Sequence, residues 1–286
     1  MAKHNGLLRH TSGTLIDGIH VRETENGTVL ARNPRRTGRR SEAQADMRCQ
    51  MGNLGANFRL FDHRITNAFA DKAPGQNDYN IYIQVNYGIH PVYITKQESK
   101  CGGCVLGNYQ YSRGNLDPIG IAVNANGVLA TNLGLGGLTI DADTTVADFS
   151  QAIMQNNRGY EALDQITFFY GEQYVDSEGV PRATMASERV VLSLTDQTKL
   201  WDVTSALGFS TVSGCLGMNT ALSNAGGSWI HSRDLDDGST QVSTQRMTVV
   251  SDILSHYQSD AAFLASANSY GGINKKSIYL SPSSNV

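Results

Sequence analysis

Charge is scarce in this chain, and so are proline and cysteine. Of its 286 residues only 17% are charged, with 23 Lys and Arg against 26 Asp and Glu, and the sequence contains 6 prolines and 4 cysteines. No apolar run approaches the roughly 18 residues that a membrane-spanning helix needs, so no membrane span is predicted. The first residues also lack the apolar core of a secretory signal peptide, and secretion by that route is not expected.

The few cysteines do not suggest a disulfide framework. Cys101 and Cys104 enclose two glycines in a Cys-x-x-Cys pattern, but Cys49 and Cys215 are single and distant in the sequence. One such pair is compatible with half of a zinc site or with a redox pair, and His90 is close enough in sequence to be a third ligand. The favoured interpretation is a glycine-rich turn whose thiols stay reduced in cytoplasm.

The charge that is present includes one concentrated positive segment, the basic arm. It comprises Arg32, Arg35, Arg36, Arg39 and Arg40. Because the whole chain has a net charge of -3, this positive charge is local and predicts contact with a particular anionic surface. Nucleic acid and an acidic partner subunit are both such surfaces. Pro34 and Gly38 interrupt the arm and favour an extended or irregular backbone.

A long amphipathic helix is predicted directly after the basic arm, from Ser41 to Asp71. Ser41 and Gln44 fit a capping box, in which a hydroxyl and a side-chain amide three residues later satisfy free backbone N–H groups. Apolar residues recur at spacings of three and four, as one face of a helix requires: Met47, Met51, Leu54, Phe58, Phe61, Ile65 and Phe69. The other faces carry three candidate interface residues, Arg48, Arg59 and Arg64.

The rest of the sequence predicts short strands joined by tight turns, which suits its 29 glycines. Asn26-Gly27 between the β-branched runs 14–22 and 27–32 predicts a hairpin. Further strands are predicted at 92–95, 105–111, 119–123, 165–175, 187–194, 227–231 and 240–250. Shorter helices are predicted at 77–87 and 259–266.

The length allows one large core or two of ordinary size, and we expect two domains, 1–137 and 138–286. In the second, 138–153 can be aligned with 192–207, and each segment ends in a capped helix. The alignment indicates either a weak internal duplication or chance similarity between two common supersecondary units. The expected fold class is α+β, with mainly antiparallel β-sandwich or small barrel domains and a long N-terminal amphipathic helix.

Motifs that carry common enzyme chemistry are missing from the sequence. It contains no Gly-x-Ser-x-Gly nucleophile turn, no Gly-x-x-x-x-Gly-Lys-Ser/Thr phosphate loop and no His-Glu-x-x-His zinc motif. The 7 histidines have no metal-ligand spacing. Asp234, Asp236 and Asp237 lack the EF-hand pattern and are interpreted as a solvated turn. We therefore expect no enzyme activity, no cofactor and no bound metal.

The first 90 residues carry a series of short motifs. They run from Asn5-Gly6 and Thr11-Ser-Gly-Thr14 through a hairpin ending in Val29-Leu-Ala-Arg32 to Asn33-Pro34-Arg35 and a helix with Gln44, Arg48 and Phe58. Near the C-terminus come Ser243-Thr-Gln-Arg-Met247, Ser269-Tyr-Gly-Gly272 and Leu280-Ser-Pro-Ser-Ser284. Together these motifs resemble an uncharacterised-domain family common in Bacteroidota and their tailed phages, with the crAss-like phages as the nearest setting. The family's aromatic-Lys-Gly element is replaced here by Asp17-Gly18 and Val21-Arg22.

The resemblance implies a phage virion structural protein, a subunit of the portal-to-tail neck or of a tail ring. Such a subunit assembles into a cyclic homo-oligomer of about a dozen copies through heterologous contacts that close by rotation. The implied partners are other copies of the chain, the portal, other neck or tail proteins, and packaged DNA near the channel. The implied location is the virion, assembled in the host cytoplasm. The basic arm and the long helix would engage a neighbouring subunit or the portal.

Two other classes of function stay open. A nucleic-acid-binding module would use the basic arm on phosphates and would lose affinity steeply with salt. A head or tail fibre, or a glycan-binding adhesin, would use the β-rich region, although the sequence shows neither repeats nor coiled-coil heptads. The number of copies in the purified particle would separate these classes from a ring subunit.

Overall fold

The computed structural model describes residues 13–16, 19–24, 27–32, 42–62, 64, 68–70, 72–73 and 75–271. The first elements form an antiparallel sheet in the order β1 (Gly13–Ile16), β2 (Ile19–Thr24) and β3 (Gly27–Arg32). The register pairs Thr24 with Gly27, which confirms the predicted hairpin. The run 14–22, predicted as one strand, forms two strands that pair on either side of Asp17-Gly18, a dipeptide that favours turns.

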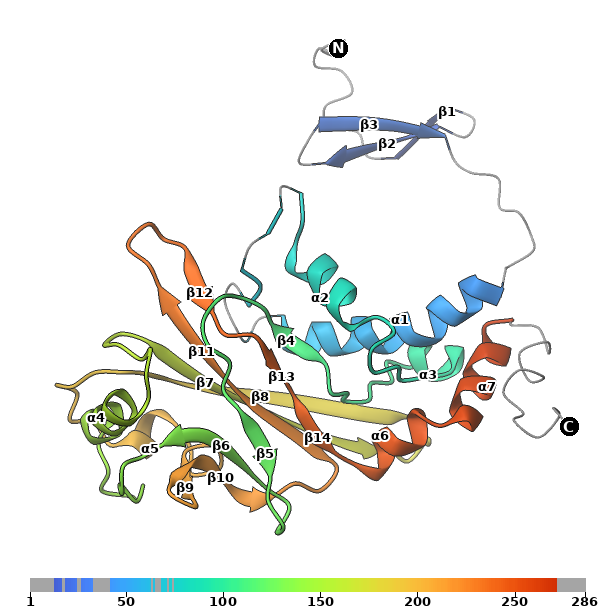
Figure 1. Cartoon of the computed structure of the whole chain (residues 1–286). Helices are drawn as coiled ribbons and strands as arrows, with labels where there is room; N and C mark the ends of the chain where they lie inside the picture. Colours follow the sequence, from blue (N-terminus) through green and yellow to red (C-terminus); the bar gives the residue numbers. More distant parts are fainter. Residues whose placement is uncertain are drawn as a thin grey trace, which may run out of the picture.

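A long antiparallel sheet runs through the centre of the molecule (Figure 1). Its order is β12 (Thr240–Val242), β11 (Ala225–Asp234), β7 (Gln165–Val175) and β8 (Pro181–Val191), and β14 (Thr248–Val250) pairs with the other end of β11. A turn at 176–179 joins β7 to β8. The Asp176 carboxylate accepts hydrogen bonds from the backbone N–H groups of Glu178 and Val180, both at 2.9 Å. Gly179 adopts a φ of 78°, which favours glycine.

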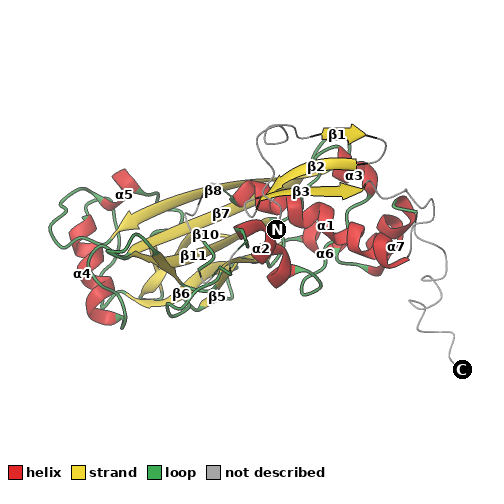
Figure 2. Ribbon diagram, turned by 90° about the horizontal axis from the view of Figure 1, so that it is seen from above, coloured by secondary structure: helices red, strands yellow, loops and turns green. Residues whose placement is uncertain are grey.

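A second sheet lies against one face of the long sheet and completes a sandwich. Its order is β5 (Ile121–Val123), β6 (Val128–Gly134), β10 (Cys215–Ala221) and β9 (Ser210–Val212). Alternate residues of β7 and β11, such as Phe168 and Trp229, meet Leu129 and Leu216 of this sheet in a buried core. The helices α4 (Val146–Asn156) and α5 (Leu200–Val203) cover one end of the sandwich (Figures 1 and 2).

The opposite face of the long sheet packs against helices. These are α1 (Glu42–Phe61), α2 (Asp78–Asn86) and α6 (Asp252–Tyr257), with a small sheet of β4 (Gln110–Ser112) and β13 (Gln245–Arg246). Two further helices, α3 (Lys96–Lys100) and α7 (Asp260–Ser269), pack against α1. The intervening residues of β7 and β11, among them Phe169 and Ile230, enter this second core. Phe61 of α1 lies there too, with its ring centroid 6.4 Å from that of Phe169. Residues on both sides of position 137 contribute to both cores.

The predicted α+β class with antiparallel, sandwich-like sheets is confirmed, and the described strands form no closed barrel. The long N-terminal helix is shorter than predicted, because α1 ends at Phe61 and not at Asp71. Beyond it, Ala70 N donates to Arg113 O at 2.8 Å, and Arg113 N donates to Ala68 O at 2.9 Å. These bonds form a strand-like bridge at Phe69, so the apolar periodicity that suggested a longer helix is met by an extended backbone instead.

Two predicted strands, 92–95 and 105–111, are largely extended loops. Their apolar residues are buried as the pattern predicts, but the backbone finds partners on helices. Tyr93 N donates to the last carbonyl of α6 at 2.9 Å, and Val105 N donates to the Asn53 side chain of α1 at 2.8 Å. Strand pairing begins at Gln110, in β4. Burial was therefore predictable here, whereas the hydrogen-bond partners were not.

The predicted strand 240–250 is divided into β12, β13 and β14. Ser112 of β4 donates to Ser243 O at 2.6 Å and accepts from Gln245 N at 3.1 Å, which draws the middle of the segment away from β11. The helix predicted at 77–87 is confirmed as α2, and the one predicted at 259–266 is α7. The helix α6 was not predicted.

The two segments that align in the sequence, 138–153 and 192–207, are joined by a symmetric pair of backbone hydrogen bonds. Val146 N donates to Thr198 O, and Leu200 N donates to Thr144 O, both at 2.9 Å. In the alignment Thr144 corresponds to Thr198 and Val146 corresponds to Leu200. The two bonds are therefore equivalent, and exchanging the two segments turns one bond into the other. The helices that follow differ, because α4 has 11 residues and α5 has 4.

Candidate functional site

The arginines predicted as contact residues lie in separate parts of the chain. Arg32 is the last residue of β3. The remaining residues of the basic arm lie outside the described residues: Arg35, Arg36, Arg39 and Arg40. Arg48 and Arg59 are exposed on α1, and Arg64, also exposed, follows the end of that helix. Of these positions, Arg64 lines a small recess on the long sheet.

The Cys-x-x-Cys pair is not joined by further metal ligands. Cys104 is buried, and burial raises its pKa to about 12, so its thiol keeps its proton. Cys101 is exposed. Arg246 Nη1 donates to His90 Nε2 at 3.2 Å, so the proposed third ligand has another partner. No three His, Cys, Asp or Glu side chains gather as metal ligands anywhere in the described part of the chain.

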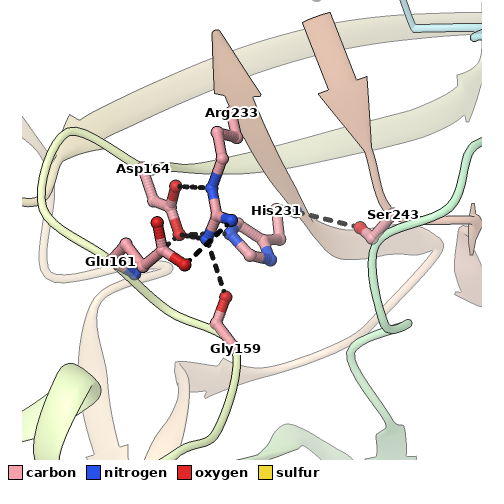
Figure 3. A network of polar contacts seen from close by, with 6 residues as sticks. All are labelled: Gly159, Glu161, Asp164, His231, Arg233 and Ser243. Atoms are coloured by element: carbon pink, nitrogen blue, oxygen red, sulfur yellow. Dashed lines mark hydrogen bonds and ion pairs between the residues drawn. The ribbon is translucent and has the colours of Figure 1, made fainter. Parts of the chain in front are cut away.

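A buried ionic network lies beneath the loop that precedes β7 (Figure 3). Asp164 is 1% exposed, and its Oδ1 accepts from Arg233 Nε at 2.6 Å. Its Oδ2 accepts from Arg233 Nη2 at 2.7 Å and from the backbone N–H of Glu161 at 2.8 Å. His231 Nε2 lies 2.8 Å from the same oxygen, and a carboxylate only accepts, so the imidazole donates. One carboxylate therefore collects four donors.

Electrostatics and strain both indicate that the network holds this loop in place. Burial alone would raise the pKa of Asp164, but the hydrogen bonds from Arg233, His231 and the Glu161 backbone outweigh it and lower that pKa to about 2. The Tyr160 ring stacks on His231, with centroids 4.2 Å apart. Leu163 adopts a φ of 71°, a left-handed conformation that is strained for a branched side chain.

The network contains a serine, a histidine and an aspartate, but not in a catalytic arrangement. Ser243 Oγ accepts from the backbone nitrogen of His231 at 3.0 Å, while the imidazole faces Asp164 (Figure 3). A general base has to reach the nucleophile's hydroxyl through its ring nitrogen. The geometry is therefore that of a structural clamp between β11 and the loop before β7.

A polar recess of about 110 Å³ lies on the long sheet where α1 stops. Its lining includes Thr167 of β7 and Ser232 of β11, both buried, whose side chains lie on the same face of the sheet as Phe169 and Ile230. Arg64 and Arg189, the latter on β8, also line the recess, and Gln165, Asp234 and Thr240 complete it.

Most of the outer edge of β8 is unpaired among the described residues. Leu192 N donates inward to Asp164 O at 2.7 Å, and Pro181 O accepts from outside the sheet, from Cys104 N at 2.8 Å. Because backbone groups alternate in direction along an antiparallel strand, the odd-numbered residues point away from β7. Their N–H and C=O groups have no partner among the described residues at Ala183, Met185, Ser187 and Arg189. Figure 2 shows β8 at the margin of the long sheet.

Sequence reasoning missed both the network and the recess. A signal for the network exists in Trp229-Ile-His231-Ser-Arg233, because alternate strand residues share a face and Trp229 marks that face as buried. A buried arginine and histidine need an anionic partner. Nothing in the sequence shows that the partner is Asp164, 67 residues before His231. The recess combines residues of four strands and the segment after α1, and it has no local signature.

Comparison with known proteins finds no matching family model, no matching curated protein and no matching solved structure. Within the described residues, no helix is both long enough and apolar enough to cross a membrane. The surface chemistry of the fold is therefore the main guide to function.

Proposed function

We propose that this protein is a structural subunit of a phage particle, a portal-to-tail neck or tail ring component that assembles into a cyclic homo-oligomer. The observation that carries the proposal is the free edge of β8. From 183 to 189 this regular strand presents outward N–H and C=O groups that no described residue uses, and such an edge can receive another strand through main-chain hydrogen bonds. Monomeric proteins usually interrupt such an edge with lysine, proline or a bulge, and residues 183–187 contain none of these.

The partner that the proposal places on this edge is an extended segment of a second copy of the chain. A ring needs heterologous contacts, in which each subunit offers one patch and receives a different one. The β8 edge supplies the receiving patch. The basic arm and α1, with its exposed Arg48 and Arg59, are the candidates for the other contacts. The resemblance of the first 90 residues to phage virion proteins supplies the phage setting.

The number of copies in solution tests the proposal, and mass photometry with native mass spectrometry measures it. We expect one discrete oligomer of about a dozen copies. Ser187→Pro removes an outward N–H and places a ring where the added strand would bond, while the bonds from β8 to β7 remain. This variant should dissociate the oligomer, whereas Ser187→Ala, which keeps the N–H, should assemble as the wild type does.

Other outcomes would point elsewhere. A wild-type chain that stays monomeric at high concentration would contradict the ring. A monomer whose DNA affinity falls steeply with salt would favour the nucleic-acid-binding alternative, and a trimer would favour a fibre. A ring that survives Ser187→Pro, with circular dichroism confirming the fold of the variant, would show that subunits meet away from the β8 edge.

A further inference from the structure

Two arginines in the recess beside β8 have unused hydrogen-bond donors. Arg64 Nε donates to Leu60 O at 2.8 Å, and its other N–H groups have no described partner. Arg189 Nη1 donates to Gln165 Oε1 at 3.1 Å, which holds its guanidinium over the sheet and leaves its remaining donors available. Neither arginine forms an ion pair within the part of the chain that the structure describes.

Two hydroxyls in the same recess also lack a partner. Thr167 is 4% exposed and Ser232 is 6% exposed, and neither side chain makes a hydrogen bond to any described residue. Neither hydroxyl oxygen is among the fully buried polar atoms that lack a partner, so both hydroxyls reach the recess, where water or a ligand can bond to them. The two hydroxyls lie on neighbouring strands and line the same recess as the arginines. The two arginines and these two hydroxyls therefore offer the recess hydrogen-bond donors that no described residue uses.

Among the described residues of the lining, the single carboxylate is already engaged. Asp234 Oδ2 accepts from Gln165 Nε2 at 2.7 Å, and its Oδ1 accepts from Thr240 Oγ1 at 2.9 Å. Two arginines against one aspartate give these described lining residues a net positive charge. A volume of about 110 Å³ has room for several water molecules, and therefore for a phosphate or carboxylate group.

We infer that this recess binds a small oxyanion, with Arg64 and Arg189 supplying the charge and Thr167 and Ser232 donating hydroxyl hydrogen bonds. Guanidinium groups match the oxygen pairs of phosphate and carboxylate, which gives both strength and orientation. The occupant has two sources with this chemistry, a free phosphate ion and a carboxylate side chain of a neighbouring copy. The site is complete within one chain, so the inference does not depend on the proposed ring.

Titration of the full chain with inorganic phosphate tests the site, by calorimetry at constant ionic strength set with sodium chloride. We expect saturable binding of one phosphate per chain. Arg64→Gln and Arg189→Gln should each weaken binding about tenfold or more, because a charge-assisted donor is lost. Arg158→Gln, at an exposed arginine after α4, is the matched control and should bind as the wild type does.

A further variant separates the site from general damage to the fold. Asp234→Asn removes the one negative charge of the lining, so phosphate should bind several-fold more tightly, a gain that misfolding cannot produce. Wild-type protein that shows no saturable binding would overturn the inference, and so would arginine variants that bind phosphate unchanged.

The source of the oxyanion is identified by titrating the assembled oligomer and the dissociated Ser187→Pro chain side by side. Binding by both indicates a site for a free ion. Binding by the dissociated chain alone indicates that a neighbour's carboxylate occupies the recess in the oligomer. If the chain does not assemble at all, the proposed ring fails while phosphate binding by the monomer still supports the site.

Discussion

Replacing Asp164 by asparagine should remove the charge on which the buried network depends. The carboxylate accepts from Arg233, from His231 and from the backbone of Glu161. Asparagine offers one acceptor oxygen, and its NH₂ group would face donors of Arg233 or His231. The guanidinium would then keep only the exposed carboxylate of Glu161, 3.2 Å from its Nη1, as a counter-ion. Breaking a buried ion pair by removing one partner typically costs more than losing an exposed one.

The lowered pKa of Asp164 gives the size of the expected loss in the free energy of unfolding. A fall from the ordinary 3.8 to about 2 corresponds to about 2.5 kcal/mol of stability for the ionised state. Loss of one partner of a buried pair commonly costs about 3–5 kcal/mol. We therefore expect Asp164→Asn to lower the free energy of unfolding by about 3 kcal/mol at neutral pH. The folded-state pKa is depressed, so this contribution is fully present above about pH 4 and is lost as pH falls towards about 2.

Urea unfolding followed by circular dichroism measures the effect at several pH values between 7 and 3. The gap between wild type and Asp164→Asn should be constant from pH 7 to about pH 5 and should narrow below about pH 4. Asp237→Asn is the control, because Asp237 is exposed and bonds only to Ser239 among the described residues, and it should change stability by less than about 0.5 kcal/mol. A variant of Asp164 as stable as the control would refute the reasoning.

Two further predictions concern packing and thiol reactivity. Gly208→Ala should lower the free energy of unfolding by about 2–3 kcal/mol, because a Cβ there would overlap the buried ring of Phe168. Gly134→Ala, whose Cβ would meet only ordinary contact at 3.8 Å, should leave the urea midpoint nearly unchanged. Iodoacetamide should label exposed Cys101 in the native protein and spare Cys104, which is buried with its pKa raised to about 12, as peptide mass spectrometry would show. Equal labelling of both would mean that the loop carrying Cys104 opens readily.

The sequence predicted elements where local pattern and tertiary environment agree. The helix α2 and the strand β7 appear almost as expected, because apolar periodicity and turn residues favour the same conformation that packing requires. The segments at 92–95 and 105–111 differ, since an extended apolar run is buried equally well beside a strand or a helix. The side chain of Asn53 then provides the bonds that a neighbouring strand would have made. Apolar periodicity therefore predicts which residues are buried, but it does not predict which element supplies the hydrogen bonds to their backbone.

The candidate site residues were harder to predict than the helices and strands, and the reason is physical. The basic arm is easy to recognise because its arginines are close together in the sequence. Such a cluster can be identified without knowing how the chain folds. Arg64 and Arg189 come together only after α1 and β8 pack on the same sheet. Arg64 was among the interface candidates for its place on a helix, yet it lies beyond the helix and faces the recess. Its predicted role rested on the wrong local structure.

The point where α1 ends links that error to the proposed anion site. Phe61 packs against Phe169, and the next residues of β7 on the same face towards its start are Thr167 and Gln165. A helix continued to Asp71 would add turns of about 5.4 Å each beside this part of the sheet, and would cover it with the apolar side chains of Ile65 and Phe69. Because the chain instead leaves the helix and pairs Phe69 with Arg113, the end of the sheet stays open and polar. Among the described residues, the early end of α1 therefore keeps the helix off Thr167 and Ser232, and it places Arg64 beside them in the lining of the recess.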